Sequence, residues 1–143
     1  MGHKVNPTAY RTGVNKGWSS IWYTSKAQFA DYLHEDLKVR EFVNKKLMNA
    51  GVQEVKVKRS MNKVLVEIKV ARPGIVIGRG GAGIEELKTS LKKMIKGDVD
   101  LKIFEIKRPE ASAKLIADTV KAQLERRIVP KYAVSREIEN AKN

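Results

Sequence analysis

The chain has 143 residues, no cysteine, and 29 Lys and Arg against 16 Asp and Glu, which gives a net charge of +13. The absence of cysteine excludes disulfide scaffolds, thiol nucleophiles and cysteine-ligated metal sites, and it suits a reducing compartment. Hydrophobic residues make up 42% of the chain, enough for one core, and the basic excess predicts an acidic polymer as partner. Nucleic acid is favoured over a membrane, because the sequence has no apolar run long enough to cross a bilayer and no basic helix with an aromatic face.

Residues 1–24 show neither helical nor strand periodicity, and they contain several glycines and both tryptophans, Trp18 and Trp22. The first acidic residue of the chain is Asp31, so the basic residues before it lie on an acid-free segment; they include Lys4, Arg11 and Lys16. We therefore predict an extended basic arm over residues 1–24, with tryptophans that dock on the domain or on RNA.

The beginning of the sequence has no apolar signal-peptide core, and Asn6 stands where a myristoylation motif has Ser or Thr. We expect a cytoplasmic location. Residues 25–143 are expected to form a single domain.

A capping-box pattern at residues 25–28 predicts the start of a helix that ends by Gly51. A break near Glu35 and Asp36 is compatible with the pattern. Apolar residues recur at helical spacing along this helix and are expected to face the core; they are Phe29, Tyr32, Leu33, Leu37, Val43 and Leu47.

Alternating apolar residues over 55–70 predict a β-hairpin that turns at residues 60–62, with one buried face. Its other face carries Lys56, Lys58, Lys63 and Lys69. A third strand is predicted over residues 99–103, and Pro109 ends it before a further helix. The expected inward residues of that helix are Ile116, Val120 and Leu124. The resulting order is helix, strand, strand, helix, helix, strand, helix.

The most informative segment runs from an apolar turn through a glycine loop into a helix predicted over residues 84–94. The loop consists of Gly78, Arg79, Gly80 and Gly81. Its glycines have no Cβ to hold off a sugar-phosphate backbone, and they tolerate positive φ angles. The first amides of the helix and its dipole favour phosphate, Arg79 adds positive charge, and no acidic residue precedes Glu85. The segment predicts a phosphate cradle.

Gly78, Gly80 and Gly83 also fit the G-x-G-x-x-G pattern of dinucleotide-binding proteins, so a nucleotide-cofactor-dependent enzyme is the alternative. That pattern requires a preceding strand and an acid at the end of the next strand. Here Pro73 interrupts the apolar run, and Asp98 opens the next strand. A KH (K-homology) loop requires only a one-turn helix, Gly-x-x-Gly and a second helix, which the sequence supplies. A purely structural turn is the third interpretation.

Catalytic signals are weak. His3 and His34 lie in different segments, and His34 stands among acidic residues, which favours an exposed helix position over a metal ligand. No Ser or Thr nucleophile has a base at recognisable spacing, and the phosphate-binding P-loop motif is absent. Glu85 and Glu86 suit the positive end of a helix better than acid–base catalysis. We predict no catalytic residues, no metal and no cofactor.

Three stretches together resemble the S3 family of small-subunit ribosomal proteins of the bacterial or organellar type; they are residues 1–7, 71–81 and 123–127. The resemblance covers almost the whole chain. It implies an α+β fold, the type II KH domain with the order αββααβ, with a basic amino-terminal arm and an extra carboxy-terminal helix. It also implies a place in the head of the small subunit, 16S-type ribosomal RNA as ligand, and proteins S10 and S14 as neighbours near the messenger RNA entry channel.

Family members continue into a second α/β domain, and they carry a basic cluster after the position of residues 123–127. In this sequence the corresponding segment is residues 131–136, in which only Lys131 and Arg136 are charged. This weakens the expectation of a role in unwinding messenger RNA. The candidate RNA-binding residues are the loop residues Gly78, Arg79, Gly80 and Gly81 with Arg72, the arm residues Lys4, Arg11 and Lys16, and the carboxy-terminal residues Arg126, Arg127, Lys131 and Arg136.

Overall fold

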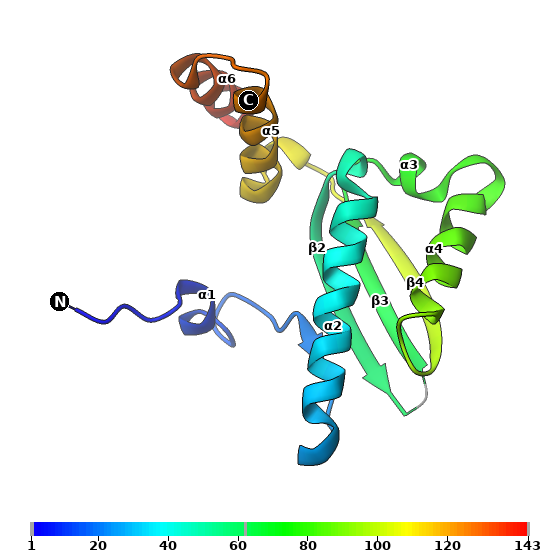
Figure 1. Cartoon of the computed structure of the whole chain (residues 1–143). Coiled ribbons are helices and arrows are strands. Elements are labelled where there is room, and N and C mark those ends of the chain that lie inside the picture. Colours follow the sequence, from blue (N-terminus) through cyan, green and yellow to red (C-terminus); the bar gives the residue numbers. More distant parts are fainter. Residues whose placement is uncertain (1, 62, 143) are drawn as a thin grey trace.

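The computed structural model describes residues 2–61 and 63–142, and its core is a sheet of four strands (Figure 1). The strands are β1 (Ser20–Ile21), β2 (Val52–Ser60), β3 (Lys63–Val70) and β4 (Asp98–Glu105), and they lie side by side in this order. β2 and β3 are antiparallel, whereas β1 runs parallel to β2 and β4 runs parallel to β3. The sheet is therefore mixed, as expected of an α+β fold.

The helices are α1 (Pro7–Tyr10), α2 (Lys26–Lys46), α3 (Pro73–Ile77), α4 (Ala82–Lys92), α5 (Ala113–Glu125) and α6 (Pro130–Lys142). The described residues also form 3₁₀ turns: η1 (Met48–Ala50) between α2 and β2, η2 (Arg79–Gly81) between α3 and α4, and η3 (Pro109–Ala111) between β4 and α5. Figure 1 shows α2 lying across one face of the sheet beside α4, with α5 and α6 packed together at one end of the sheet. The series α2, β2, β3, α3, α4, β4 reproduces the predicted order αββααβ.

The core fills the space between the sheet and helices α2 and α4. Strands β2 and β3 alternate between buried and less buried residues, so one face of the hairpin is apolar, as predicted. The fully buried side chains include Val39 and Val43 of α2, Val57, Val66, Ile68 and Val70 of the hairpin, and Leu91 of α4. The opposite face carries ion pairs, among them Lys58–Glu67 at 2.7 Å and Lys69–Glu54 at 3.0 Å.

Helix α2 differs from its prediction in two respects. It is continuous through Asp36, which is completely buried, and the hydroxyl of Ser25 makes no capping hydrogen bond. The first turns of α2 project beyond the sheet in Figure 1, so apolar residues there have no strand to cover them. Phe29 is 51% exposed, and Leu33 is also exposed. Leu37 lies further along α2, next to the buried Asp36, and is 50% exposed, so the expected core positions of all three residues are wrong.

The arm is less extended than predicted. Asn6 caps the short helix α1 by accepting hydrogen bonds from the amides of Thr8 and Ala9. Further along, β1 joins the sheet, and the ring of Trp22 packs against α2, with its centroid 5.4 Å from that of Phe29. The arm thus has a docked end.

In the predicted hairpin turn Met61 has a φ of +47°, and Asn62 lies outside the described residues.

The carboxy-terminal part contains two helices instead of the single one predicted. Helix α5 buries Leu115, which the sequence did not single out; Ile116 and Val120 are only half-buried, and Leu124 is 42% exposed. Helix α6 then folds back on α5 and buries Ala133. None of the helices in the described part of the chain combines the length and apolar character that a membrane span requires.

Candidate nucleic-acid interface

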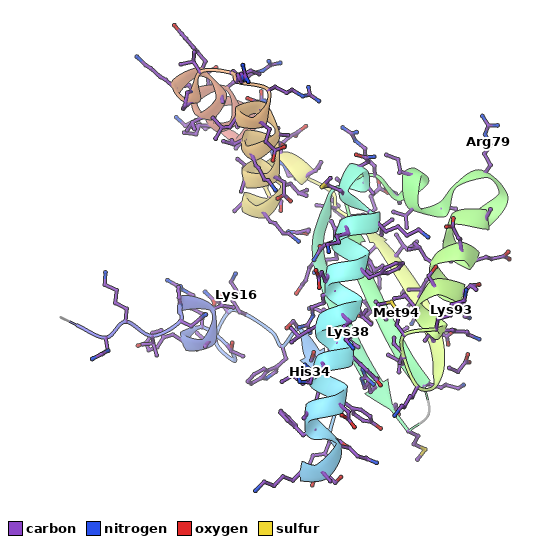
Figure 2. All side chains as sticks on the ribbon, viewed as in Figure 1. Lys16, His34, Lys38, Arg79, Lys93 and Met94 are labelled. Carbon is purple, nitrogen blue, oxygen red and sulfur yellow. The ribbon has the colours of Figure 1, made fainter. Side chains whose placement is uncertain are left out.

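The glycine loop joins α3 to α4, and its backbone depends on glycine. Gly78, Gly80 and Gly81 have φ angles of +68°, +62° and +85°, in the left-handed region that other residues avoid. Helix α4 begins at Ala82, two residues earlier than predicted, directly after this turn. Arg79 projects from the tip of the loop away from the rest of the molecule (Figure 2).

The outer side of the loop is open. A Cβ atom built on Gly80 or Gly81 would meet no other atom within 4 Å. Arg79 is exposed, and among the described residues its side chain makes no ion pair and no hydrogen bond. A sugar-phosphate backbone can therefore approach these residues closely, with the amino-terminal end of α4 and one free guanidinium beside it.

Gly83, unlike the loop glycines, lies in the contact between α3 and α4. A Cβ atom on Gly83 would lie 2.5 Å from the carbonyl oxygen of Val76 and 3.1 Å from that of Ile77. The residue therefore allows α3 and α4 to pack against each other. The segment before the loop is the helix α3 instead of a strand, and Asp98 begins β4 instead of ending it. Both observations depart from the dinucleotide-binding arrangement.

Other charges near the loop have structural partners or lie at its margin. Glu86 accepts a hydrogen bond from Lys46 of α2 at 2.7 Å, so it joins two helices. Glu85 lies in the first turn of α4, where its charge suits the helix dipole. Arg72 precedes α3 and is exposed. His34 is exposed on α2, as the sequence suggested (Figure 2).

The basic residues of the arm form a second group. Lys4, Arg11 and Lys16 are all exposed. Figure 2 places Lys16 on the opposite side of α2 from Arg79, so the structure does not bring the arm and the loop together. The guanidinium of Arg11 donates a hydrogen bond to the carbonyl oxygen of Pro7 at 3.1 Å, which ties it to α1.

The carboxy-terminal arginines form a third group, in the turn between α5 and α6. Helix α5 ends at Glu125, so Arg126 and Arg127 follow its last turn, and both arginines are exposed. Arg127 has a φ of +62°, and its amide donates to the carbonyl oxygen of Leu124 at 2.8 Å. This helix ending normally uses glycine. Lys131 and Arg136 are exposed on α6.

A buried polar cluster, which the sequence gave no reason to expect, lies where the arm meets the sheet. Its centre is Asp36, and the guanidinium of Arg59 on β2 binds this carboxylate at 2.6 Å and that of Glu35 at 2.8 Å. Burial acts to lower the pKa of Arg59, but hydrogen bonds and attraction to Glu35 and Asp36 outweigh it and raise the pKa. Arg59 is therefore cationic, and it also lies 4.6 Å from the ring centre of Tyr32.

Comparison with known proteins identifies the relatives of the chain. A family model described as KH domain matches residues 38–111, which confirms the fold class. The small ribosomal subunit protein uS3 of Myxococcus xanthus is 46% identical over 141 residues, which cover 99% of this chain and 64% of that protein. The uS3 protein of Pelagibacter ubique is 43% identical over 140 residues, with 98% and 62% covered. The resemblance to the S3 family is confirmed, and the chain spans less than two thirds of the length of these relatives.

Proposed function

The chain belongs to the KH domain family, and we propose that it is a structural constituent of the small ribosomal subunit that binds 16S-type ribosomal RNA. Its relatives are named small ribosomal subunit protein uS3. The proposal includes a cytoplasmic location within the small subunit and a place in its head. Because the matched relatives are longer than this chain, the activity of the whole protein is part of the proposal.

The glycine loop is the observation that carries the proposal. Its glycines adopt positive φ angles, the side chain of Arg79 projects into solvent, and α4 begins immediately after them. A KH loop of this kind clamps about four nucleotides of backbone. Phosphate groups are held by charge and by backbone amides, which position the RNA without reading its sequence.

The three basic groups divide the task. The loop, with Arg72, faces one RNA segment, and the arm carries a second set of cations. The third set lies in the turn after α5 and on α6; it consists of Arg126, Arg127, Lys131 and Arg136. Separate basic groups on a small domain suit a folded RNA that surrounds the protein. We divide the chain accordingly into the arm, residues 1–24, and the KH domain with its carboxy-terminal helices, residues 25–143.

The protein neighbours are also part of the proposal. We assign S10 and S14 as partners in the head, with the messenger RNA entry channel nearby. An exposed apolar side of α2, formed by Phe29, Leu33 and Leu37, suits contact with a neighbouring protein. Because α6 carries few basic residues, we propose that messenger RNA makes only a minor part of the contacts of this chain.

A role without catalysis fits the loop better than the nucleotide-dependent alternative. Gly83 lies in the close contact between α3 and α4, and the segment directly before the loop is the helix α3 instead of a strand. The loop therefore supports RNA binding. A thermal-shift assay with dinucleotides separates the two functions, because only an enzyme of the alternative class gains stability from them.

The proposal is tested by sedimentation of the tagged full chain expressed in bacterial cells. After a high-salt wash, which removes weakly held basic proteins, we expect the chain in the small-subunit fraction of a sucrose gradient. An unrelated protein of similar size and charge serves as control and is expected at the top of the gradient. Finding the chain at the top with this control contradicts the proposal.

A further inference from the structure

The junction between the arm and the domain depends on one buried carboxylate. Strand β1 has only two residues, and it pairs with β2 through Ser20 opposite Val57 and Ile21 opposite Lys58. The amide of Val57 donates a hydrogen bond to the carbonyl oxygen of Ser19 at 2.9 Å. So short a strand is marginal by itself, so other contacts must keep the arm in place.

Asp36 supplies those contacts by dividing its two oxygens between the arm and the sheet. Its Oδ2 atom accepts hydrogen bonds from the hydroxyl of Ser20 at 2.6 Å and from the indole Nε1 of Trp22 at 2.8 Å. Its Oδ1 atom accepts from Arg59, at 3.1 Å from Nε and 2.6 Å from Nη2. The carboxylate is completely buried, so each donor compensates part of its desolvation.

A second arginine completes the junction. The guanidinium of Arg40, one turn further along α2, donates a hydrogen bond to the hydroxyl of Ser20. Trp22 is held from the other side, because its ring packs against Phe29 and stands edge-on to Tyr32 at 5.7 Å. The arm is thus fixed at residues 20–22, whereas residues 2–18 are almost entirely exposed.

This fixed point limits where the basic residues of the arm can reach. Lys16 lies four residues before Ser20, so it stays within about 14 Å of that residue. If residues 20–22 detach, the next fixed point is the start of α2 at Lys26, and the reach grows to about 35 Å. The local concentration of Lys16 at a neighbouring RNA site then falls about fourfold, since it varies roughly as the −3/2 power of tether length, and the cations further from Ser20 lose less.

We propose that Asp36 is a positioning residue for RNA binding, which acts through Ser20 and Trp22 to hold the cations of the arm at the edge of the sheet. The inference rests on the proposed function, because it requires the arm to contact RNA. It assigns to an acidic, buried residue a part in binding an acidic polymer. The carboxylate touches no RNA and works only through the arm.

The test uses the full chain with the paired change Ser20→Ala and Trp22→Phe, which removes the arm's donors to Asp36 but keeps its pair with Arg59. Hydrogen exchange of the Val57 amide, measured without RNA, reports whether the arm is docked. Affinity for a 16S-type ribosomal RNA transcript reports the consequence. We expect faster exchange at Val57, unchanged exchange in β3 where it pairs with β4, and an RNA affinity about fourfold lower.

Two further variants separate positioning from general damage. Glu35→Gln alters the other partner of Arg59 without touching the arm, and we expect parental Val57 exchange and RNA affinity. In a background with Lys4, Arg11 and Lys16 changed to Gln, the paired change is expected to cause no further loss of affinity, because the arm no longer binds. That background also tests the premise that the arm contacts RNA, since it must itself bind RNA more weakly than the parent.

Three results overturn the inference. Unchanged Val57 exchange in the paired variant means that Asp36 does not hold the arm. Faster exchange with parental RNA affinity means that docking does not position the arm for RNA. An equal loss of affinity in the parental and the Gln-substituted backgrounds means that the change acts on the fold alone. If the parent chain itself does not bind RNA, the proposed function is contradicted instead, and Val57 exchange still reports whether the arm is docked.

Discussion

Replacement of Gly83 by alanine tests whether this glycine serves packing or ligand binding. The added Cβ would lie 2.5 Å from the carbonyl oxygen of Val76, so α3 and α4 have to move apart. Overpacking of this kind costs about 1–3 kcal/mol, whereas alanine gains at most about 1 kcal/mol of helix propensity over glycine. We therefore expect Gly83→Ala to lower the free energy of unfolding by up to about 2 kcal/mol.

The matched control is Gly74→Ala. Gly74 lies on α3 with no positive φ, and a Cβ there would meet nothing within 4 Å. Thermal unfolding followed by circular dichroism is the assay, and about 1 kcal/mol corresponds to a shift of about 2–4 °C in a chain of this size. We expect a lower midpoint for Gly83→Ala and an equal or higher one for Gly74→Ala. Equal midpoints for the two variants refute the packing role of Gly83.

Three further predictions concern charged residues. Replacing both Arg126 and Arg127 with Glu is expected to reduce cosedimentation with small subunits far more than it lowers the melting temperature, since exposed charges contribute about 0–1 kcal/mol to stability; a collapse of the melting temperature would make these arginines structural. Arg127→Gly is expected to raise the free energy of unfolding by about 1 kcal/mol in urea unfolding, because Arg127 has a φ of +62°. The same variant is expected to bind RNA more weakly in a titration. The hydrogen bond from Lys92 lowers the pKa of Asp98. This carboxylate therefore stabilises the fold above its ordinary pKa, and the contribution disappears as the pH falls through the lowered value. Lys92→Gln is expected to return the pKa of Asp98 toward its ordinary value in an NMR titration, and an unchanged pKa would exclude Lys92 as the cause.

The central part of the fold could be predicted because its signals are local. Alternating valines mark half-buried strands, and the glycine loop between two helices is recognisable from residue types alone. Helix α2 could not be predicted fully. The acidic pair Glu35 and Asp36 reads as a break only while its partner Arg59, some two dozen residues along the chain, is unknown.

The prediction of the carboxy-terminal helices failed for a related reason. Helix α5 ends at Glu125 in a turn that normally carries glycine, but Arg127 occupies the left-handed position. No residue type therefore marks the end of one helix and the approach of the next. The inward face of α5 was also wrong, because the helix buries Leu115, which lies near Gly51, and leaves Leu124 42% exposed.

The candidate site could be predicted as three stretches of sequence but not as an arrangement. The positive φ angles of the loop follow from its glycines, whereas the separation of Lys16 from Arg79 across α2 depends on the path of the arm. That path is fixed by the contacts of Trp22 and Ser20 with Asp36. Contacts of this kind join distant parts of the chain, and no periodicity reports them.

RNA binding through the glycine loop is tested most directly by the paired change Arg79→Asp and Gly80→Asp. The control, Lys93→Asp with Lys96→Gln, alters the net charge by the same amount at the opposite end of α4 (Figure 2). In titrations with single-stranded RNA we expect the loop variant to lose at least about tenfold in affinity, because charge-assisted hydrogen bonds contribute about 1.5–3 kcal/mol. The control is expected to lose much less, and circular dichroism verifies that both variants are folded. Equal affinities of the loop variant and the control would contradict the account.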